Sequence, residues 1–183
     1  GFFIMQLLKI YYAYFSPGNT TEKVVSHIAS SFQNYPVESI NLTDYATRQE
    51  DYYFKENELL IIGVPAYGGR VPAPVVDALR HFTGSNTPVV LVATYGNRDI
   101  DDTLIELKKN VIDKGFIPVG AASFVCQHTF LKECAEGRPD EEDLKMAGEF
   151  GDKLKERLRL LVTYDAGDLE VPGTFPYTKP PMG

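Results

Sequence analysis

The sequence Gln6-Leu-Leu-Lys-Ile-Tyr-Tyr-Ala-Tyr-Phe15, followed at once by Ser16-Pro-Gly-Asn-Thr-Thr21, decides the fold class. The first part is rich in apolar and aromatic residues and indicates a β-strand, whereas the glycine and hydroxyl residues of the second part indicate a tight loop. Beyond the loop, apolar residues recur at helical spacing over residues 24–32, and Thr20 or Thr21 is placed to cap the first turn. The pattern therefore predicts a strand, a loop and a helix in direct succession.

Strands and helices alternate along the rest of the chain. Further strands are predicted at residues 37–42, 58–64, 88–93 and 116–125. Helices are predicted from apolar residues at helical spacing: Val75, Leu79 and Phe82; then Ile100, Leu104, Leu107 and Val111, capped by Asp99 or Asp101; and finally Leu144, Ala147, Phe150, Leu154, Leu158 and Leu161. Residues 45–57 carry no pattern that assigns them to either type.

This alternation predicts an α/β fold. Residues 58–64 are almost continuously apolar, which is typical of a parallel strand that is buried on both faces. Because crossovers between parallel strands are right-handed and cover the faces of the sheet, we expect a doubly wound, five-stranded parallel sheet with helices on both faces. This three-layer α/β/α sandwich is assigned to residues 1–170. The proline-rich residues 171–183 are interpreted as a C-terminal extension or linker.

Composition and charge exclude several classes of protein. With 183 residues, 44% of them apolar and 23% charged, the chain matches one globular domain rather than a disordered or collagen-like protein. A net charge of −7 disfavours nucleic acid as a partner, because nucleic-acid binding needs a basic surface. Cys126 and Cys134 are too few for a disulfide framework or an iron–sulfur cluster. We expect a cytoplasmic protein without a membrane span, a secretory signal or a metal site.

Three loops form the candidate binding site, because ligands of open parallel sheets bind beyond the carboxyl ends of the strands. The first loop contains Ser16, Pro17, Gly18, Asn19, Thr20 and Thr21. Its three hydroxyls and the backbone N–H groups at the start of a helix can surround one phosphate without a lysine. Neither the Walker motif nor the dinucleotide-binding glycine motif is present. The alternative is an ordinary turn with a helix cap.

The second and third loops both combine tyrosine, glycine and arginine. The second contains Pro65, Ala66, Tyr67, Gly68, Gly69 and Arg70, and the third contains Thr94, Tyr95, Gly96, Asn97 and Arg98. Each loop by itself could be a plain turn. Together with the first loop they predict a slot in which a flat, phosphate-bearing heterocycle stacks on tyrosine while its polar edge bonds to the main chain.

Three segments of the sequence resemble the flavodoxin-like domain of the EFR1-type flavodoxin/ferredoxin family: Tyr14-Phe-Ser-Pro-Gly-Asn-Thr-Thr-Glu-Lys-Val24, Gly63-Val-Pro-Ala-Tyr-Gly-Gly-Arg-Val-Pro72 and Ala93-Thr-Tyr-Gly-Asn-Arg98. The resemblance implies a flavodoxin fold that binds FMN, with the first loop around the phosphate and the other two around the isoalloxazine ring. The first loop of the family usually reads Ser-Pro-Thr-Gly. Here Gly18 and Asn19 stand in the last two places, and asparagine tolerates the left-handed backbone that the turn needs.

The resemblance implies an electron carrier without catalytic side chains, in which FMN does the redox chemistry. Tyr95 would cover one face of the ring and Tyr67 its rim or other face. Arg70 and Arg98 would favour an anionic reduced flavin and so raise the reduction potential, whereas Asp99, Asp101 and Asp102 would lower it. His128 would either lie near the flavin or be a surface or hydrogen-bonding residue. Redox proteins such as a ferredoxin or a reductase are the expected partners. The alternative function is an FMN-dependent NAD(P)H:quinone or flavin reductase.

The residues disfavour a phospho-receiver domain, a pair of iron–sulfur clusters and a zinc site. A phospho-receiver domain needs magnesium-binding carboxylates after its first and third strands, where this sequence has Phe15-Ser16 and Pro65-Ala66. Family members of the EFR1 type commonly carry a ferredoxin module with two cysteine-rich clusters, and this sequence contains no such cluster. The spacing of Cys126, His128 and Cys134 is too loose to indicate a zinc site.

Overall fold

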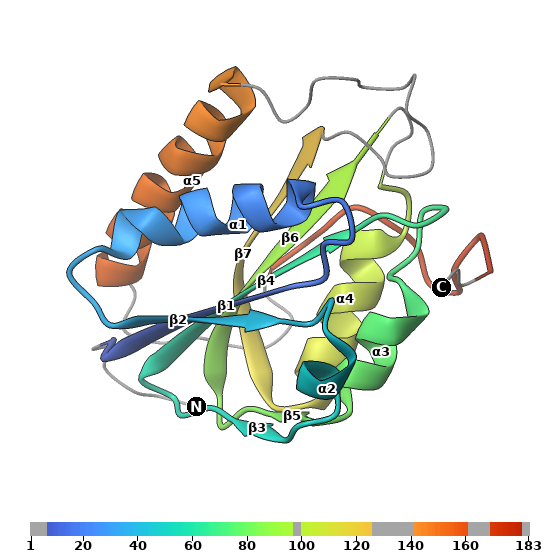
Figure 1. Ribbon diagram of the computed structural model, residues 1–183, viewed down its shortest axis with the longest axis horizontal. Coiled ribbons are helices and arrows are strands. Elements are labelled where there is room, and N and C mark those ends of the chain that lie inside the picture. The colour runs from blue at the N-terminus through green and yellow to red at the C-terminus, as the bar shows by residue number, and fades with distance from the viewer. Residues whose placement is uncertain (1–6, 97–99, 126–140, 161–168, 181–183) are drawn as a thin grey trace.

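The structure, a computed structural model, describes residues 7–96, 100–125, 141–160 and 169–180. Its main sheet has five parallel strands in the order β2-β1-β4-β6-β7 (Figure 1). These strands are β1 (Lys9–Tyr14), β2 (Val37–Asn41), β4 (Glu58–Pro65), β6 (Thr87–Tyr95) and β7 (Phe116–Val125). The chain steps from β1 outward to β2 and then returns to the other side of β1. The strand order therefore reverses between β1 and β4, which is the place where ligands of such sheets bind.

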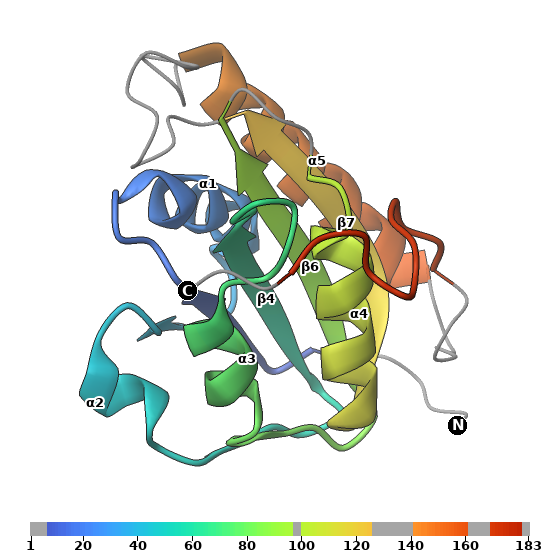
Figure 2. The same cartoon turned by 90° about the vertical axis from the view of Figure 1, so that its right-hand side faces the viewer.

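Helices cover both faces of the sheet. One face carries α1 (Thr20–Ala29) and α5 (Glu141–Leu160), and the other carries α3 (Ala73–Leu79) and α4 (Thr103–Asp113) (Figures 1 and 2). Each layer buries its own hydrophobic cluster against the sheet, and the residues of β4 and β6 alternate between the two clusters. The expected doubly wound, three-layer α/β/α sandwich is confirmed. In the described residues, no helix combines the length and the apolar character that a membrane span requires.

A small second sheet was not expected. Residues 45–57, which the sequence left unassigned, form the short helix α2 (Tyr45–Arg48) and the strand β3 (Tyr52–Tyr53). β3 pairs with β5 (Phe82–Thr83), so the prediction that Phe82 belongs to a helix is wrong. Helix α3 ends at Leu79, and the ring of Phe82 packs against Phe54, with 5.4 Å between ring centroids. The apolar spacing correctly predicted that Phe82 lies in the core, but it did not predict that its backbone is part of a strand.

Two predicted helix caps also differ from the structure. The N-cap of α1 is Asn19 rather than Thr20 or Thr21, and the N-cap of α4 is Asp102 rather than Asp99 or Asp101. Neither N-cap side chain accepts a capping bond from its own helix. At Asn19 the side chain makes no capping bond because the backbone of this residue is left-handed, with φ 65°. At Asp102 the carboxylate is directed to a different segment of the chain, the C-terminal tail.

The C-terminal tail, residues 169–180, forms neither helix nor strand and lies along α4 (Figure 2). At the first residue of the tail, the carbonyl oxygen of Leu169 accepts a hydrogen bond from Lys108 Nζ at 2.5 Å. Val171 then packs against the hydrophobic cluster on the α3 and α4 face. Gly173 approaches α4 so closely that a Cβ there would lie 2.5 Å from a side-chain carbon of Ile105. The tail ends beside the loop that follows β4.

Candidate functional site at the carboxyl edge of the sheet

The three predicted loops meet at one edge of the sheet. They follow β1, β4 and β6, which are neighbours, and parallel strands place their carboxyl ends together. Phe15 N donates to Gly63 O at 3.2 Å, and Ala66 N donates to Thr94 O at 2.8 Å. The structure therefore places the three predicted loops next to one another at this edge of the sheet. Asn97, Arg98 and His128 lie outside the described residues.

Ser16 anchors the first loop. Its N–H donates to Thr43 Oγ1 at 2.7 Å, and its hydroxyl oxygen accepts from the backbone N–H of Glu22 at 3.0 Å. Its carbonyl oxygen accepts from Asn19 N at 3.0 Å, which closes the turn. Because the Ser16 hydroxyl is the acceptor in its bond to Glu22, its hydrogen remains a donor for a further acceptor.

The exposed part of the first loop has the chemistry of an anion site. Pro17, Gly18 and Asn19 are exposed at the N-terminus of α1, where the helix dipole is positive. The left-handed φ of 65° at Asn19 matches the expectation that asparagine can replace glycine here. No acidic residue occurs from Ser16 to Thr21. A phosphate group fits this donor set.

Thr21 lies deeper in the protein than the exposed residues of the first loop. It is buried, and its hydroxyl shares a hydrogen bond of 2.8 Å with the hydroxyl of Thr94 at the end of β6. One of the two hydroxyls donates in this pair, so the other keeps its hydrogen for another acceptor. The pair joins the first loop to the third across the strand between them.

The second loop contains a tight turn. Tyr67 N donates to Arg70 O at 2.9 Å and Arg70 N donates to Tyr67 O at 3.1 Å, with Gly68 at φ 59° and Gly69 at φ 81° between them. Two successive positive φ angles are typical of a type I′ turn, which explains the glycine pair. The absence of a Cβ also lets the turn pack against the start of α4, where Gly69 is buried beside the side chain of Asp101.

The two tyrosines of the site differ in exposure. Tyr95 is half-buried at the end of β6, where a flat ligand could stack on its ring. Tyr67 is only 6% exposed, and its ring packs edge-on against Phe15 with 6.1 Å between centroids. The sequence left Tyr67 open between the rim and the second face of the ligand ring. The burial of Tyr67 favours a contact at the rim.

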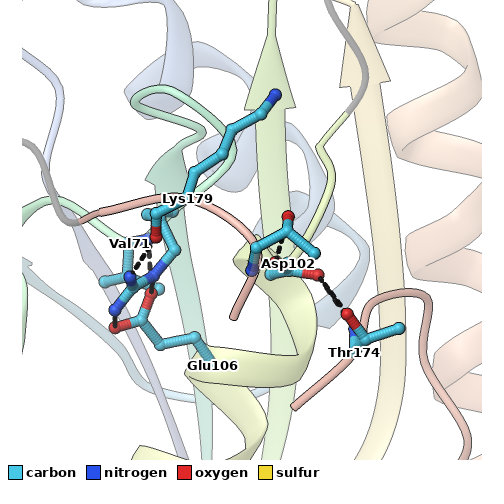
Figure 3. Close-up of polar contacts among 7 residues, drawn as sticks. Val71, Asp102, Glu106, Thr174 and Lys179 are labelled. Carbon is cyan, nitrogen blue, oxygen red and sulfur yellow. Dashed lines mark hydrogen bonds and ion pairs between the residues drawn. The ribbon is translucent and has the colours of Figure 1, made fainter. Parts of the chain in front are cut away.

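Arg70 is engaged within the protein. Its guanidinium forms two hydrogen bonds with the Glu106 carboxylate, at 2.7 and 2.9 Å (Figure 3). It also lies 4.1 Å from the ring centroid of Tyr177. Glu106 Oε1 also accepts from the backbone N–H of Val71 at 2.9 Å. The hydrogen bonds to Glu106 raise the pKa of Arg70. The arginine therefore stays charged, but a carboxylate compensates that charge.

Sequence reasoning missed three residues beside the site, Glu106, Thr174 and Thr178, and it treated Asp102 only as a charge near the flavin. Asp102 is 3% exposed, and its carboxylate accepts hydrogen bonds from both threonines. The backbone N–H of Thr178, first among several hydrogen bonds, holds the pKa of Asp102 below its ordinary value. No local pattern could have identified these residues, because each contact joins positions more than 30 residues apart. In the part of the chain that the structure describes, no three metal-ligating side chains form a cluster.

Flavodoxins are among the solved structures with a similar fold. An archaeal flavodoxin has a TM-score of 0.58 and 14% sequence identity, with 83% of this chain and 99% of that chain covered. Flavodoxin 2 from Bacillus cereus has a TM-score of 0.57 and 16% identity, with 81% and 99% covered. The fold is flavodoxin-like. A third structure, Fusobacterium nucleatum flavodoxin bound to flavin mononucleotide, has a TM-score of 0.56 and 17% identity, with 81% and 98% covered.

The comparisons support the flavodoxin-like fold through structure alone. No protein-family model matches the sequence. No curated protein is significantly similar to it either. At these low sequence identities, ligand and activity have to be argued from the residues of this chain.

Proposed function

We propose that this protein is a cytoplasmic, FMN-binding electron carrier, similar to the flavodoxin-like domain of EFR1-type proteins. One observation carries the proposal. The first loop, with its exposed helix N-terminus, the Gly68–Gly69 turn and the half-buried Tyr95 follow neighbouring strands at the edge of the sheet where the strand order reverses. A flavodoxin of similar fold has been solved with flavin mononucleotide bound, which adds support. The carrier would exchange electrons with a ferredoxin or a reductase.

The proposed phosphate site is the first loop. Backbone N–H groups at the start of α1 would hold the phosphate together with the hydroxyls of Ser16 and Thr20, and the Thr21–Thr94 pair could add one hydroxyl hydrogen. Pro17, Gly18 and Asn19 would shape the turn around it. This donor set contains no lysine or arginine, so the affinity for phosphate would come from the helix N-terminus and hydroxyls.

The proposed ring site is formed by the other two loops. Tyr95 would stack on the isoalloxazine, and the main chain of Gly68, Gly69 and Gly96 would meet its polar edge. The remaining contacts would come from Pro65, Ala66, Tyr67, Arg70, Thr94, Asn97, Arg98 and His128. When bound, FMN supplies the redox chemistry, while the protein binds and orients it. Because Glu106 compensates the charge of Arg70, Arg98 is the stronger candidate for raising the reduction potential.

The experiment is flavin binding followed by visible absorption spectroscopy. The purified protein is incubated with FMN or riboflavin and then passed through gel filtration. We expect retained FMN with a perturbed absorption band and weaker retention of riboflavin, which lacks the phosphate. Absence of retained flavin would overturn the proposal.

A matched pair of variants locates the phosphate site. Asn19→Val places a β-branched residue at φ 65°, where it is strained, whereas Asn19→Gly accepts this backbone. We expect Asn19→Val to lose FMN affinity and Asn19→Gly to keep it. Steady oxidation of NAD(P)H by the flavin-loaded protein with a quinone would identify a reductase instead of a carrier.

A further inference from the structure

We propose that residues 171–180 form a clamp that holds the Gly68–Gly69 turn in place, and that Asp102 is the positioning residue through which this clamp acts. The role of the turn in contacting flavin rests on the proposed function. The clamp itself is defined by contacts within this chain, so the two ideas can fail separately.

Asp102 is the centre of the clamp. Its Oδ1 accepts from Thr174 N at 2.9 Å and Thr174 Oγ1 at 3.3 Å (Figure 3). Its Oδ2 accepts from Thr178 N at 2.7 Å and Thr178 Oγ1 at 2.9 Å. Four hydrogen bonds thus saturate one buried carboxylate, and they fold the tail around it. The geometry commits the side chain to the tail, since it makes no capping bond to α4.

The same residue touches the turn through its backbone. Asp102 N donates to Gly69 O at 2.9 Å. The preceding residue, Asp101, lies so close to Gly69 that a Cβ on the glycine would be 2.5 Å from Asp101 Oδ2. The start of α4 is therefore packed directly against the turn.

The tail reaches the turn from a second direction. Lys179 Nζ lies 2.6 Å from Asp101 Oδ2, and the carbonyl oxygen of Lys179 accepts from Arg70 Nη1 at 2.5 Å. The Arg70 guanidinium lies over the ring of Tyr177. Gly69 and Arg70 are thus held between the start of α4 and the tail, and Asp102 connects these two supports.

Polar contacts hold the tail more than apolar burial does. Residues 172–176 are exposed, and Phe175 keeps 61% of its surface in contact with solvent. The apolar and aromatic contacts of this segment come from Val171, Phe175 and Tyr177. Ordering ten residues has an entropic cost that these few contacts must offset. Loss of the Asp102 carboxylate should therefore release the tail without disturbing the core of the sheet.

A clamped turn would be pre-organised for its ligand. A type I′ turn of two glycines has unusually many alternative conformations, so fixing it before binding removes an entropic cost from the binding step. The clamp would then increase flavin affinity although none of Asp102, Thr174 and Thr178 touches the flavin.

The test is residue-resolved amide hydrogen exchange of the chain without flavin. Asp102→Asn keeps the size of the side chain but turns one acceptor into a donor, which in either amide orientation faces the donors of Thr174 or of Thr178. We expect faster exchange, by about tenfold, at Thr174 and Thr178 and also at Tyr67 and Arg70 in the turn. Asp77→Asn, an equal charge change at an exposed position on α3, should leave all four rates unchanged.

A second variant, together with the amides of β4, distinguishes release of the tail from a general loss of structure. Truncation after Glu170 should accelerate the same turn amides, while the amides of β4 keep their protection in both variants. Unchanged exchange at Tyr67 and Arg70 in both variants would overturn the clamp.

Flavin affinity separates the clamp from the proposed function. If the unmodified chain binds flavin, Asp102→Asn should weaken FMN and riboflavin binding by the same factor, about tenfold, because the turn faces the ring and not the phosphate. Equal affinities in the variant and the unmodified chain would overturn the positioning role. If the unmodified chain binds no flavin, the proposed function fails, and the exchange rates still decide whether the clamp exists.

Discussion

Arg70 and Glu106 form a buried ion pair whose partners depend on one another. Their side chains are 10% and 6% exposed, and Glu106 also accepts from the backbone N–H of Val71. Removing one member of such a pair leaves an uncompensated charge in a poorly solvated position. At the scale of the residue, Glu106 is therefore a buried carboxylate that holds the second loop against α4.

We predict that Glu106→Ala lowers the free energy of unfolding by about 3–5 kcal/mol. Glu106→Gln should lose less, because its amide oxygen can still accept a hydrogen bond from Arg70 or Val71. Urea denaturation measures both changes. The exposed Glu149→Ala on α5 is the control, with an expected change within about 0.5 kcal/mol. A loss below about 1 kcal/mol for Glu106→Ala would contradict the buried-pair interpretation.

At the scale of the element, α1 is fastened to the sheet at the site itself. The Thr21–Thr94 hydrogen bond joins the first turn of α1 to the end of β6, and both residues are almost fully buried. Further along, α1 lies so close to β4 that a methyl group on Gly63 would collide with Val25. The helix N-terminus is therefore placed by contacts with two strands.

We predict that Thr21→Val destabilises the protein by about 1–3 kcal/mol, because it leaves the buried hydroxyl of Thr94 without this partner. The double variant Thr21→Val with Thr94→Val should lose less than the sum of the single losses, with a coupling of about 1 kcal/mol. A double-mutant cycle of urea unfolding experiments provides the measurement. Strictly additive losses would show that the two hydroxyls do not interact.

At the scale of the whole molecule, the stability of the fold should depend on pH through carboxylates that hold segments in place. Hydrogen bonds from Thr178 and Thr174 lower the pKa of Asp102 from its ordinary value of 3.8. Hydrogen bonds from Thr47 likewise lower the pKa of Asp44, the N-cap of α2. A lowered pKa in the folded state means stability that is present above the ordinary pKa and is lost as the pH falls through the folded value.

We predict that the contribution of Asp102 to stability is complete from pH 7 down to about pH 5 and declines below about pH 4. The difference in unfolding free energy between the unmodified protein and Asp102→Asn should therefore be constant at pH 7 and pH 5 and smaller at pH 3. Urea titrations at the three pH values test this. A difference that grows as the pH falls would contradict the assigned direction of the pKa shift.

The local sequence determined the five strands of the main sheet, most of the helices and the position of the three candidate loops at strand ends. Continuous apolar runs and helical spacing act through neighbouring residues, so β4, β6 and β7 were predicted within two residues of their observed ends. The glycine pair at Gly68 and the asparagine at Asn19 were also recognisable, because a positive φ restricts which residue types fit.

Only the tertiary structure decided which polar side chains became partners. Arg70 appeared from its loop to be a cation beside a ligand, yet Glu106, 36 residues away, compensates its charge. Phe82 had helical spacing, but pairing between β3 and β5 made it part of a strand. Asp102 meets a tail more than 70 residues further along the chain. Such contacts depend on the order of strands in the sheet, which no spacing within a single element contains.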